Sequence, residues 1–284
     1  CRDLGVEIRR EAPVTQILTR RHTAVGVQLE DGTEIPAQVV ASSIDPHQTF
    51  ERLLPEDALP EEFATAVRRI DYSSASLKIN VALAELPNFR CQQGTDPQPH
   101  HRGTIHISPD MDYLERAYDD AKYGRPSENP ILEITLPSAV DTTLAPSGKH
   151  VMNLFVQYAP YQLREGNWDE LKEKFADRCL EILGEYAPNI PGAVLHRQVV
   201  SPRDLERTYG LTGGNIFQGA MSLHQLFAMR PVPGWADHRT PLKNLYLCGA
   251  ASHPGGRRDG GLRTQCGPRN PSRPLTSLAD GAGR

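Results

Sequence analysis

Residues 245–256 read LYLCGAASHPGG, and this stretch decides how the rest of the sequence is interpreted. Its first four residues form a short apolar run typical of a buried strand, and Gly249 allows the chain to turn tightly after it. The following Pro254-Gly255-Gly256 is typical of the opening of a helix. A strand, a glycine turn and a helix start occur together where a phosphate or a flat cofactor lies against bare backbone. Taken alone, the motif is as unspecific as a lone glycine fingerprint.

The tail after Gly256 has a different composition. Residues 257–284 hold six arginines against two aspartates, with five glycines, three prolines and no aromatic residue. Such a segment cannot bury enough apolar surface to offset the entropy of ordering the chain. The sequence therefore predicts an aberrant, disordered tail where a helix is expected.

The N-terminal segment, residues 1–45, predicts a β-meander. We expect strands at residues 6–10, 14–30 and 33–44, with a hairpin turn at Asp31-Gly32. Residues 1–5, CRDLG, resemble the last turn of a helix that ends at a glycine cap. Because a protein does not begin with a helix end, we expect this chain to be the C-terminal part of a longer one.

Residues 46–240 alternate helical and strand patterns without a repeat. We expect a helix at 60–71 and strands at 73–83 and 150–160. The clearest helix spans 167–186, where Asn167 is expected to cap the N-terminus and Glu170 to complete a capping box. Its apolar stripe is interpreted as core and consists of Trp168, Leu171, Phe175, Cys179, Ile182 and Tyr186.

Charge and hydropathy restrict the class of partner. The chain has 284 residues, a net charge of −4 and a pI near 6.2, without a sustained basic face. This argues against nucleic acid or an anionic membrane as the main partner and favours a small-molecule substrate. No run approaches the ~18 apolar residues of a membrane helix, so no transmembrane segment is expected.

The residues that most often carry chemistry give no strong site. The five cysteines, at positions 1, 91, 179, 248 and 266, have no metal or redox spacing, so free thiols are expected and dithiol chemistry is not. His100, His101 and His106 lack a carboxylate or cysteine at ligand spacing, and no metal site is predicted. A triad of Ser222, His224 and Asp237 lacks the GxSxG elbow. No catalytic residue is assigned.

A second glycine pair precedes Asn215. Gly213 and Gly214 stand in an apolar context, which is typical of backbone that passes close to something flat or crowded. A plain turn between a strand and a helix explains the pair equally well.

Four longer segments carry a resemblance to a known family. They are APVTQIL (12–18), VQLEDGTEIPAQVVASSIDP (27–46), GGNIFQGAMSLHQLFAMRPVPG (213–234) and TPLKNLYLCGAASHPGG (240–256). Together they resemble the C-terminal half of the phytoene-dehydrogenase-like FAD-dependent oxidoreductases. The resemblance covers residues 1–256 nearly end to end.

The resemblance implies an α/β fold. It is the C-terminal part of a glutathione-reductase-like FAD-binding fold with an inserted α+β, mixed-sheet substrate domain. The FAD domain would comprise 1–45 and the return strand and flavin turn at 241–256, and the substrate domain 46–240. The N-terminal Rossmann half of this fold, with the GxGxxG turn that cradles the FAD pyrophosphate, is absent from this sequence.

The resemblance also implies cofactor-binding residues. Val14, with its neighbours Pro13 and Thr15, resembles the edge that touches the adenine side, and Ser42 and Ser43 resemble a strand end near the cofactor. The C-terminal flavin segment corresponds to Gly249, His253, Pro254, Gly255 and Gly256. Gly213, Gly214 and Asn215 would lie near the isoalloxazine ring. Lys78 is a weaker candidate, since it could pair with a carboxylate instead.

Family members of this kind transfer hydride from a C–H or C–N bond to flavin, so no acid, base or nucleophile is required. The implied activity is that of an FAD-dependent dehydrogenase, desaturase or amine oxidase on an unidentified substrate, and this chain is not expected to be active alone. The alternative is a non-catalytic regulatory or scaffold protein on the same fold, with a mitochondrial protein partner. The implied compartment is the mitochondrial matrix, or the cytoplasm if the source is bacterial.

The resemblance offers an explanation of the tail. In the family the segment continues as GGGVxGxxGRNAA, whereas here Gly256 is followed by RRDGGLRTQCG. With free choice of synonymous codons, residues 257–268 read one nucleotide later can spell VGTAASGRNAA. We therefore hypothesise a frameshifted reading of the flavin helix, with an alternative exon as the competing explanation.

Overall fold

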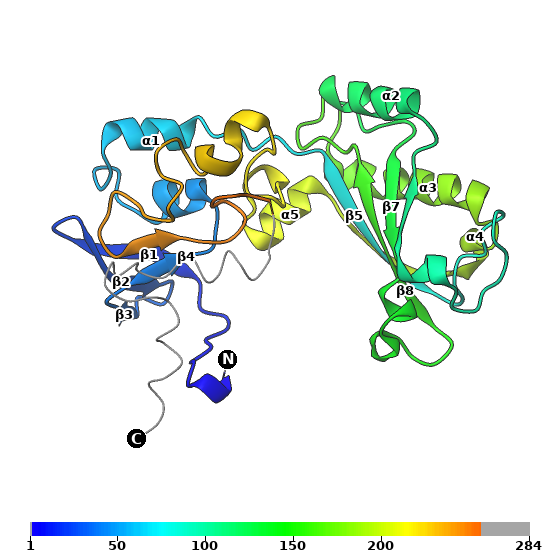
Figure 1. The fold of residues 1–284 in the computed structure, drawn as a ribbon, viewed down its shortest axis with the longest axis horizontal. Helices are drawn as coiled ribbons and strands as arrows, with labels where there is room; N and C mark the ends of the chain where they lie inside the picture. The colour runs from blue at the N-terminus through cyan, green and yellow to red at the C-terminus, as the bar shows by residue number, and fades with distance from the viewer. Residues whose placement is uncertain (1, 257–284) are drawn as a thin grey trace. The chain divides into compact units, whose positions relative to one another are not determined.

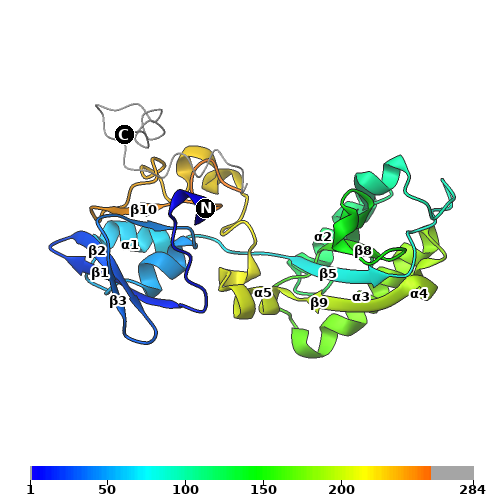
Figure 2. The same cartoon turned by 90° about the horizontal axis from the view of Figure 1, so that it is seen from below.

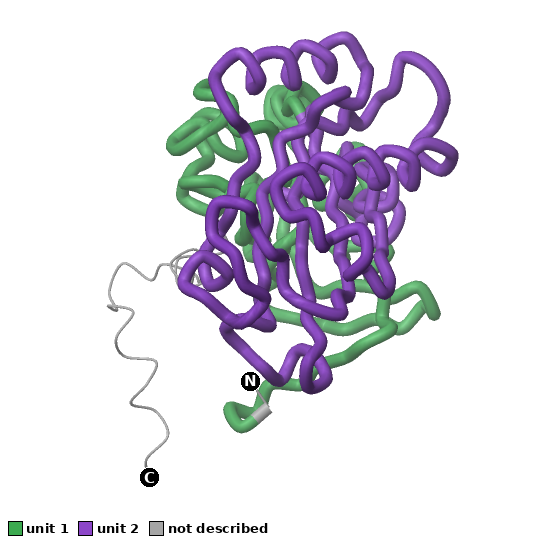
Figure 3. Tube along the Cα trace, turned by 90° about the vertical axis from the view of Figure 1, so that its right-hand side faces the viewer, with its two compact units in different colours: residues 1–71, 217–284 green, residues 72–216 purple. Residues whose placement is uncertain are grey.

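The computed structural model describes residues 2–256, and these form two compact units. Unit 1 comprises Cys1–Asp71 and Phe217–Arg284, and unit 2 comprises Tyr72–Ile216 (Figure 3). Each unit has its own cluster of buried apolar residues. The chain therefore passes from unit 1 to unit 2 and back.

Unit 1 contains two small sheets (Figure 2). The strands β1 (Val14–Arg20), β2 (Thr23–Leu29) and β3 (Glu34–Pro36) form an antiparallel meander. The strands β4 (Val40–Ser42) and β10 (Leu245–Leu247) pair in parallel. The predicted hairpin at Asp31-Gly32 is confirmed, because it joins β2 to β3.

Two details of the meander differ from prediction. Residues 6–10 form no strand, since Val6 and Ile8 are 50% and 51% exposed and gain no neighbouring strand among the described residues. A second turn interrupts the predicted strand at 14–30. Arg21 and His22 adopt positive φ angles of 47° and 58° there, in a turn without glycine that the sequence does not announce.

The core of unit 1 extends well beyond residue 45. Phe50 lies in a π-helical turn (Gln48–Arg52), and Phe63 lies in α1 (Glu61–Arg68). The two rings pack edge to face, with 5.0 Å between their centroids. The apolar cluster that contains them also includes Leu245 and Leu247 of β10. The units consequently divide at 71/72 and 216/217, whereas the sequence predicts domain boundaries at 45/46 and 240/241. The segments on either side of unit 2, residues 46–71 and 217–240, have apolar residues that pack into the core of unit 1, and this packing accounts for the difference.

Unit 2 is built on a five-stranded antiparallel sheet in the order β6-β7-β8-β5-β9 (Figure 1). Its strands are β5 (Ser76–Leu83), β6 (Thr104–Ile107), β7 (Ile131–Thr135), β8 (His150–Gln157) and β9 (Val194–Val200). The predicted strand β5 is confirmed, with its alternating residues Leu77, Ile79, Val81 and Leu83 all buried. This alternation places one face of β5 in the core.

The helix α3 (Trp168–Tyr186) packs its apolar stripe into the same core. Asn167 caps it as predicted, because its side chain accepts a hydrogen bond from the Glu170 amide at 3.0 Å. Trp168 and Cys179 are buried, whereas Tyr186, at the end of the predicted stripe, is 38% exposed. The remaining helices are α2 (Met111–Lys122), α4 (Ile190–Ala193) and α5 (Pro202–Tyr209). No helix among the described residues is both long and apolar enough to cross a membrane.

Candidate functional site

The ends of β4 and β10 bring two predicted site segments together in unit 1 (Figure 1). Leu247 is in register with Ser42, and the Cys248 amide donates to the Ser42 carbonyl at 2.8 Å. The carboxyl ends of parallel strands meet at the same edge of a sheet, so Ser42-Ser43 and the turn after Leu247 begin next to each other. The Ser42 hydroxyl, 9% exposed, lies 2.7 Å from the Thr49 hydroxyl and is thereby fixed.

The turn from Gly249 to Gly256 folds back over these strand ends. Gly249 has a φ of 86°, and a Cβ atom there would lie 3.1 Å from the Ser43 carbonyl oxygen. The Gly256 amide donates to the Ala250 carbonyl at 3.2 Å, which closes the turn. The predicted strand and tight glycine turn are therefore present.

Gln218 links the turn to the other strand end. Gln218 is 9% exposed; its Nε2 donates to the Ser43 carbonyl at 3.2 Å, and its Oε1 accepts from the Ala251 amide at 3.2 Å. Through these two hydrogen bonds, Gln218 connects the segment that returns from unit 2 to both Ser43 and the turn. No pattern in the sequence marks Gln218 as a site residue.

Two side chains in the turn have buried polar atoms without a partner. Ser252 is 1% exposed, and its hydroxyl has no hydrogen-bond partner among the described residues. The buried Nδ1 atom of His253 has none there either. An unsatisfied buried polar atom costs about 1–3 kcal/mol, and a ligand that forms hydrogen bonds with these two atoms would remove that cost. This is the observation by which the turn fits a cofactor.

Val14 is not brought to this turn. It is 38% exposed at the start of β1, opposite Leu29 in the meander, and not in the sheet that β4 and β10 form. Nothing in the geometry connects Val14 with Ser42 or Gly249.

The other four predicted residues belong to unit 2. Lys78 points away from the core that Leu77 and Ile79 enter, and it is exposed. No ion pair of Lys78 with a carboxylate occurs among the described residues, which leaves the alternative pairing without support there.

Gly213, Gly214 and Asn215 occupy a tight turn that packs on backbone. A Cβ atom at Gly213 would lie 2.8 Å from the Tyr72 carbonyl oxygen, and one at Gly214 would lie 2.3 Å from that of Pro202. Asn215, 3% exposed, donates from Nδ2 to the Ser73 carbonyl at 2.9 Å. Crowded backbone inside unit 2 is therefore enough to explain both glycines.

A polar network adjoins this turn. Glu206 accepts from the Gly213 amide at 2.9 Å and from the Tyr161 hydroxyl, and Arg203 donates to that hydroxyl at 2.8 Å. Burial, followed by the hydrogen bond to Glu206, raises the pKa of Tyr161 above its ordinary value. The network borders a cavity of about 500 Å³ that also includes Asn167 and Arg207.

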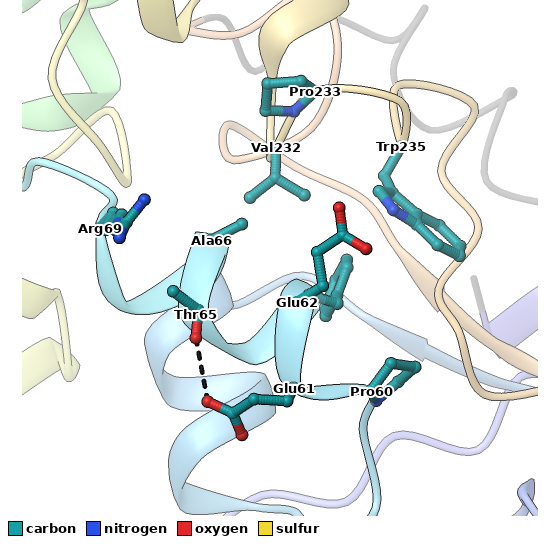
Figure 4. Close-up of a pocket in the computed structure, with 10 residues that line it drawn as sticks. Pro60, Glu61, Glu62, Thr65, Ala66, Arg69, Val232, Pro233 and Trp235 are labelled. Carbon is teal, nitrogen blue, oxygen red and sulfur yellow. Dashed lines mark hydrogen bonds between the residues drawn. The ribbon is translucent and has the colours of Figure 1, made fainter.

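A cavity of about 690 Å³ lies over α1 in unit 1 (Figure 4). One wall comes from α1, including Glu62, and from Arg69, which follows this helix; the other comes from Val232, Pro233 and Trp235. None of the predicted site residues lines it. It is therefore separate from the site at the ends of β4 and β10.

The alternative chemistries gain no support. Among residues 2–256 no group of three or more histidine, cysteine or acidic side chains is arranged to hold a metal ion. Ser222 lies 3.5 Å from His224, but Asp237 pairs with Arg239, so a triad is not assembled. Cys91, Cys179 and Cys248 are free thiols, as predicted.

A parallel strand pair that ends in a glycine turn in unit 1 and a five-stranded antiparallel sheet in unit 2 define a mixed α/β protein. The model of the family described as flavin containing amine oxidoreductase matches residues 1–264, and the chain belongs to this family. Because this family is one of flavin-containing oxidoreductases, the predicted kind of cofactor, a flavin, and the predicted oxidoreductase class are confirmed at the level of the family.

Curated relatives agree with this family. The chain is 44% identical over 259 residues to pyridine nucleotide-disulfide oxidoreductase domain-containing protein 2 of Rattus norvegicus, a match that covers 89% of this chain and 45% of the relative. It is 26% identical over 262 residues to the zeta-carotene-forming phytoene desaturase of Myxococcus xanthus, covering 89% and 46%. The predicted resemblance is confirmed, and the chain spans about half the length of these relatives.

A solved structure shares the fold. The crystal structure of an oxidoreductase from Methanosarcina mazei superposes with a TM-score of 0.53 at 19% identity, covering 94% of this chain and 48% of that one. The mixed α/β architecture is therefore shared with that structure.

Proposed function

We propose that this chain is part of an FAD-dependent oxidoreductase that oxidises a small organic molecule. In this proposal unit 1 carries the C-terminal elements of the FAD-binding domain, and unit 2 carries the substrate domain. The N-terminal Rossmann half belongs to the same protein but not to this chain, in keeping with a match to about half of each relative.

The observation that carries the proposal is the turn after β10. It combines the positive φ of Gly249 with buried, unpartnered polar atoms on Ser252 and His253. Bare backbone and unsatisfied donors beside a strand end suit a planar, polar ligand such as the flavin ring system.

The residues of the turn would hold the cofactor without reacting. Gly249, Gly255 and Gly256 would let the backbone approach it, while Ser252 and His253 would supply hydrogen bonds. Ser42 and Gln218 would keep the two strand ends in register. FAD, when bound, supplies the hydride acceptor, so the protein has only to bind, orient and exclude water.

In unit 2, Lys78 and the turn of Gly213, Gly214 and Asn215 belong to the same proposal. The exposed side chain of Lys78 is available for a contact with a bound molecule, since none of the described carboxylates pairs with it. Gly213 and Gly214 would contribute backbone groups to the contact, and the hydrogen bonds of Glu206 and Asn215 would keep this turn in place. Val14 is proposed only by resemblance, for the adenine side.

The substrate stays unidentified in this proposal, and no nucleic acid partner is included. The 44% identity to a rat relative supports a eukaryotic type of protein, and for such a protein we propose the mitochondrial matrix. The reading-frame hypothesis for the tail concerns residues 257–284, which lie outside the described residues. Sequencing the coding DNA tests it, because a shifted frame that does not spell the glycine-rich motif contradicts it.

Expression of the full-length protein, with the reading frame after Gly256 corrected, tests the function. We expect a yellow protein whose absorbance spectrum is that of bound FAD. A full-length protein that is folded but colourless, and that gains no FAD on reconstitution, would contradict the proposal and favour the non-catalytic alternative.

A further inference from the structure

Arg230 is a buried cation beside the turn after β10. Its side chain is 3% exposed, and its guanidinium donates to three backbone carbonyls within unit 1. Nη2 bonds the carbonyls of Phe217 and Gly219, and Nη1 bonds that of Gln225 at 3.4 Å. The planar fork of arginine donors therefore organises the whole segment 217–225.

The same side chain packs against the glycine turn. A Cβ atom at Gly255 would lie 2.7 Å from Cδ of Arg230 and 3.2 Å from its Nε. Gly255 has a φ of 101°, and its lack of a side chain leaves the space that Arg230 fills. The Pro254 carbonyl next to it accepts from the Phe227 amide at 3.0 Å. Arg230 thus lies between the segment 217–225 and the turn 249–256.

We propose that Arg230 is a positioning residue of the FAD site and a source of positive charge beside it. The inference rests on the proposed function, because it assumes that the turn faces FAD. It adds two roles that the resemblance does not supply. Arg230 fixes the shape of the turn through its carbonyl bonds, and its charge favours the reduced flavin, which carries more negative charge than the oxidised form.

Two physical arguments separate these roles. Lysine keeps the charge but has no planar fork, so it cannot reproduce bonds to three carbonyls in fixed directions. Methionine fills a similar volume without charge or donors. A charge held away from water acts through a low effective dielectric, so its loss changes the electronics of a nearby cofactor.

The test uses the full-length protein, with the reading frame after Gly256 corrected, as wild type and as Arg230→Lys and Arg230→Met. Arg239→Met is the matched control, because Arg239 also lies in unit 1 but is exposed and paired with Asp237. The measurements are the FAD dissociation constant, the absorbance spectrum of bound flavin, and its reduction potential against reference dyes. Circular dichroism checks the fold of each variant.

We expect both Arg230 variants to raise the FAD dissociation constant at least tenfold. Arg230→Met should also lower the reduction potential, while Arg230→Lys should keep it closer to that of the wild type. Arg239→Met should change neither quantity. Wild-type affinity and potential in Arg230→Met would overturn the inference, whereas a wild type that binds no FAD contradicts the proposed function and the inference with it.

If the Arg230 variants do not fold, Gly255→Ala tests the same contact while it keeps the charge. Gly234→Ala is its control, since Gly234 also has a positive φ, of 86°, but no atom within 4 Å of the added Cβ. A higher FAD dissociation constant for Gly255→Ala alone supports the inference. Equal FAD binding by the two alanine variants overturns it.

Discussion

A Cβ atom at Gly214 would lie 2.3 Å from the carbonyl oxygen of Pro202, so the turn before Asn215 fits against the first residue of α5 only as glycine. The three atoms nearest to this added Cβ, the carbonyl oxygen, carbonyl carbon and Cα of Pro202, all belong to backbone, which cannot move aside as a flexible side chain does. The contact lies within unit 2 and needs no cofactor.

Gly214→Ala should therefore destabilise unit 2 strongly. We expect a loss of about 3 kcal/mol or more in the free energy of unfolding, since steric overlap adds to the strain of a positive φ. Gly210→Ala is the control, because Gly210 has a similar φ of 66° but open space around its Cβ. It should lose only about 1–2 kcal/mol. Urea unfolding measures both, and equal losses would contradict the packing argument.

How much the sequence predicts depends on whether the signal is local. The alternation of Leu77 to Leu83 and the stripe of Trp168, Phe175 and Cys179 predict β5 and α3, because each pattern marks one buried face. The strand at 6–10 is predicted by composition alone and does not form, since a strand needs a partner. The apolar run 245–248 correctly predicts β10, since a strand with apolar residues is one that enters a core, as this one does in unit 1.

The candidate site is predicted in part for the same reason. Gly249, Gly255 and Gly256 are visible in the sequence because glycine marks backbone that must turn. Gln218 and Arg230 are missed because they are polar residues in an irregular segment, where no periodicity marks burial. An arginine in the apolar run FAMRPV is the one signal that could have directed attention to Arg230.

The cap of α3 offers a test of local structure. Asn167→Ala removes the acceptor for the Glu170 amide and should cost about 1 kcal/mol of unfolding free energy. Asn167→Asp keeps an acceptor at this position and should lose little. Thermal unfolding followed by circular dichroism compares the variants, and identical melting curves for Ala and Asp would argue against the cap.

The thiols should differ sharply in reactivity. Burial raises the pKa of the Cys179 thiol well above its ordinary value, whereas Cys91 is exposed. We expect iodoacetamide to modify Cys91 in the folded protein and Cys179 only after unfolding. Peptide mass spectrometry reports each site, and early modification of Cys179 would show that α3 is not packed as described.

Stability should depend on pH through His100. Burial, followed by the charge of neighbouring His101, lowers the pKa of His100 below its ordinary value of 6.5. The unfolded chain then binds a proton more readily than the folded one, so this stability is present above pH 6.5 and is lost as the pH falls below it.

Unfolding free energies at pH 7.5, 6.5 and 5.5 measure this effect. His100→Phe should weaken the decrease toward low pH, because it keeps a ring beside Phe89 and His101 without a titrating group. His224→Gln, at an exposed position, should leave the decrease unchanged. An unaltered pH dependence in His100→Phe would assign the effect to other groups.

The most direct test of the account is the flavin content of the full-length protein with the reading frame after Gly256 corrected. Purified protein should carry FAD, released on denaturation at close to one equivalent per chain, and Ser252→Ala together with His253→Phe should reduce that content. A folded wild-type protein without FAD, before and after incubation with the cofactor, would contradict the assignment of the turn after β10 as a cofactor site.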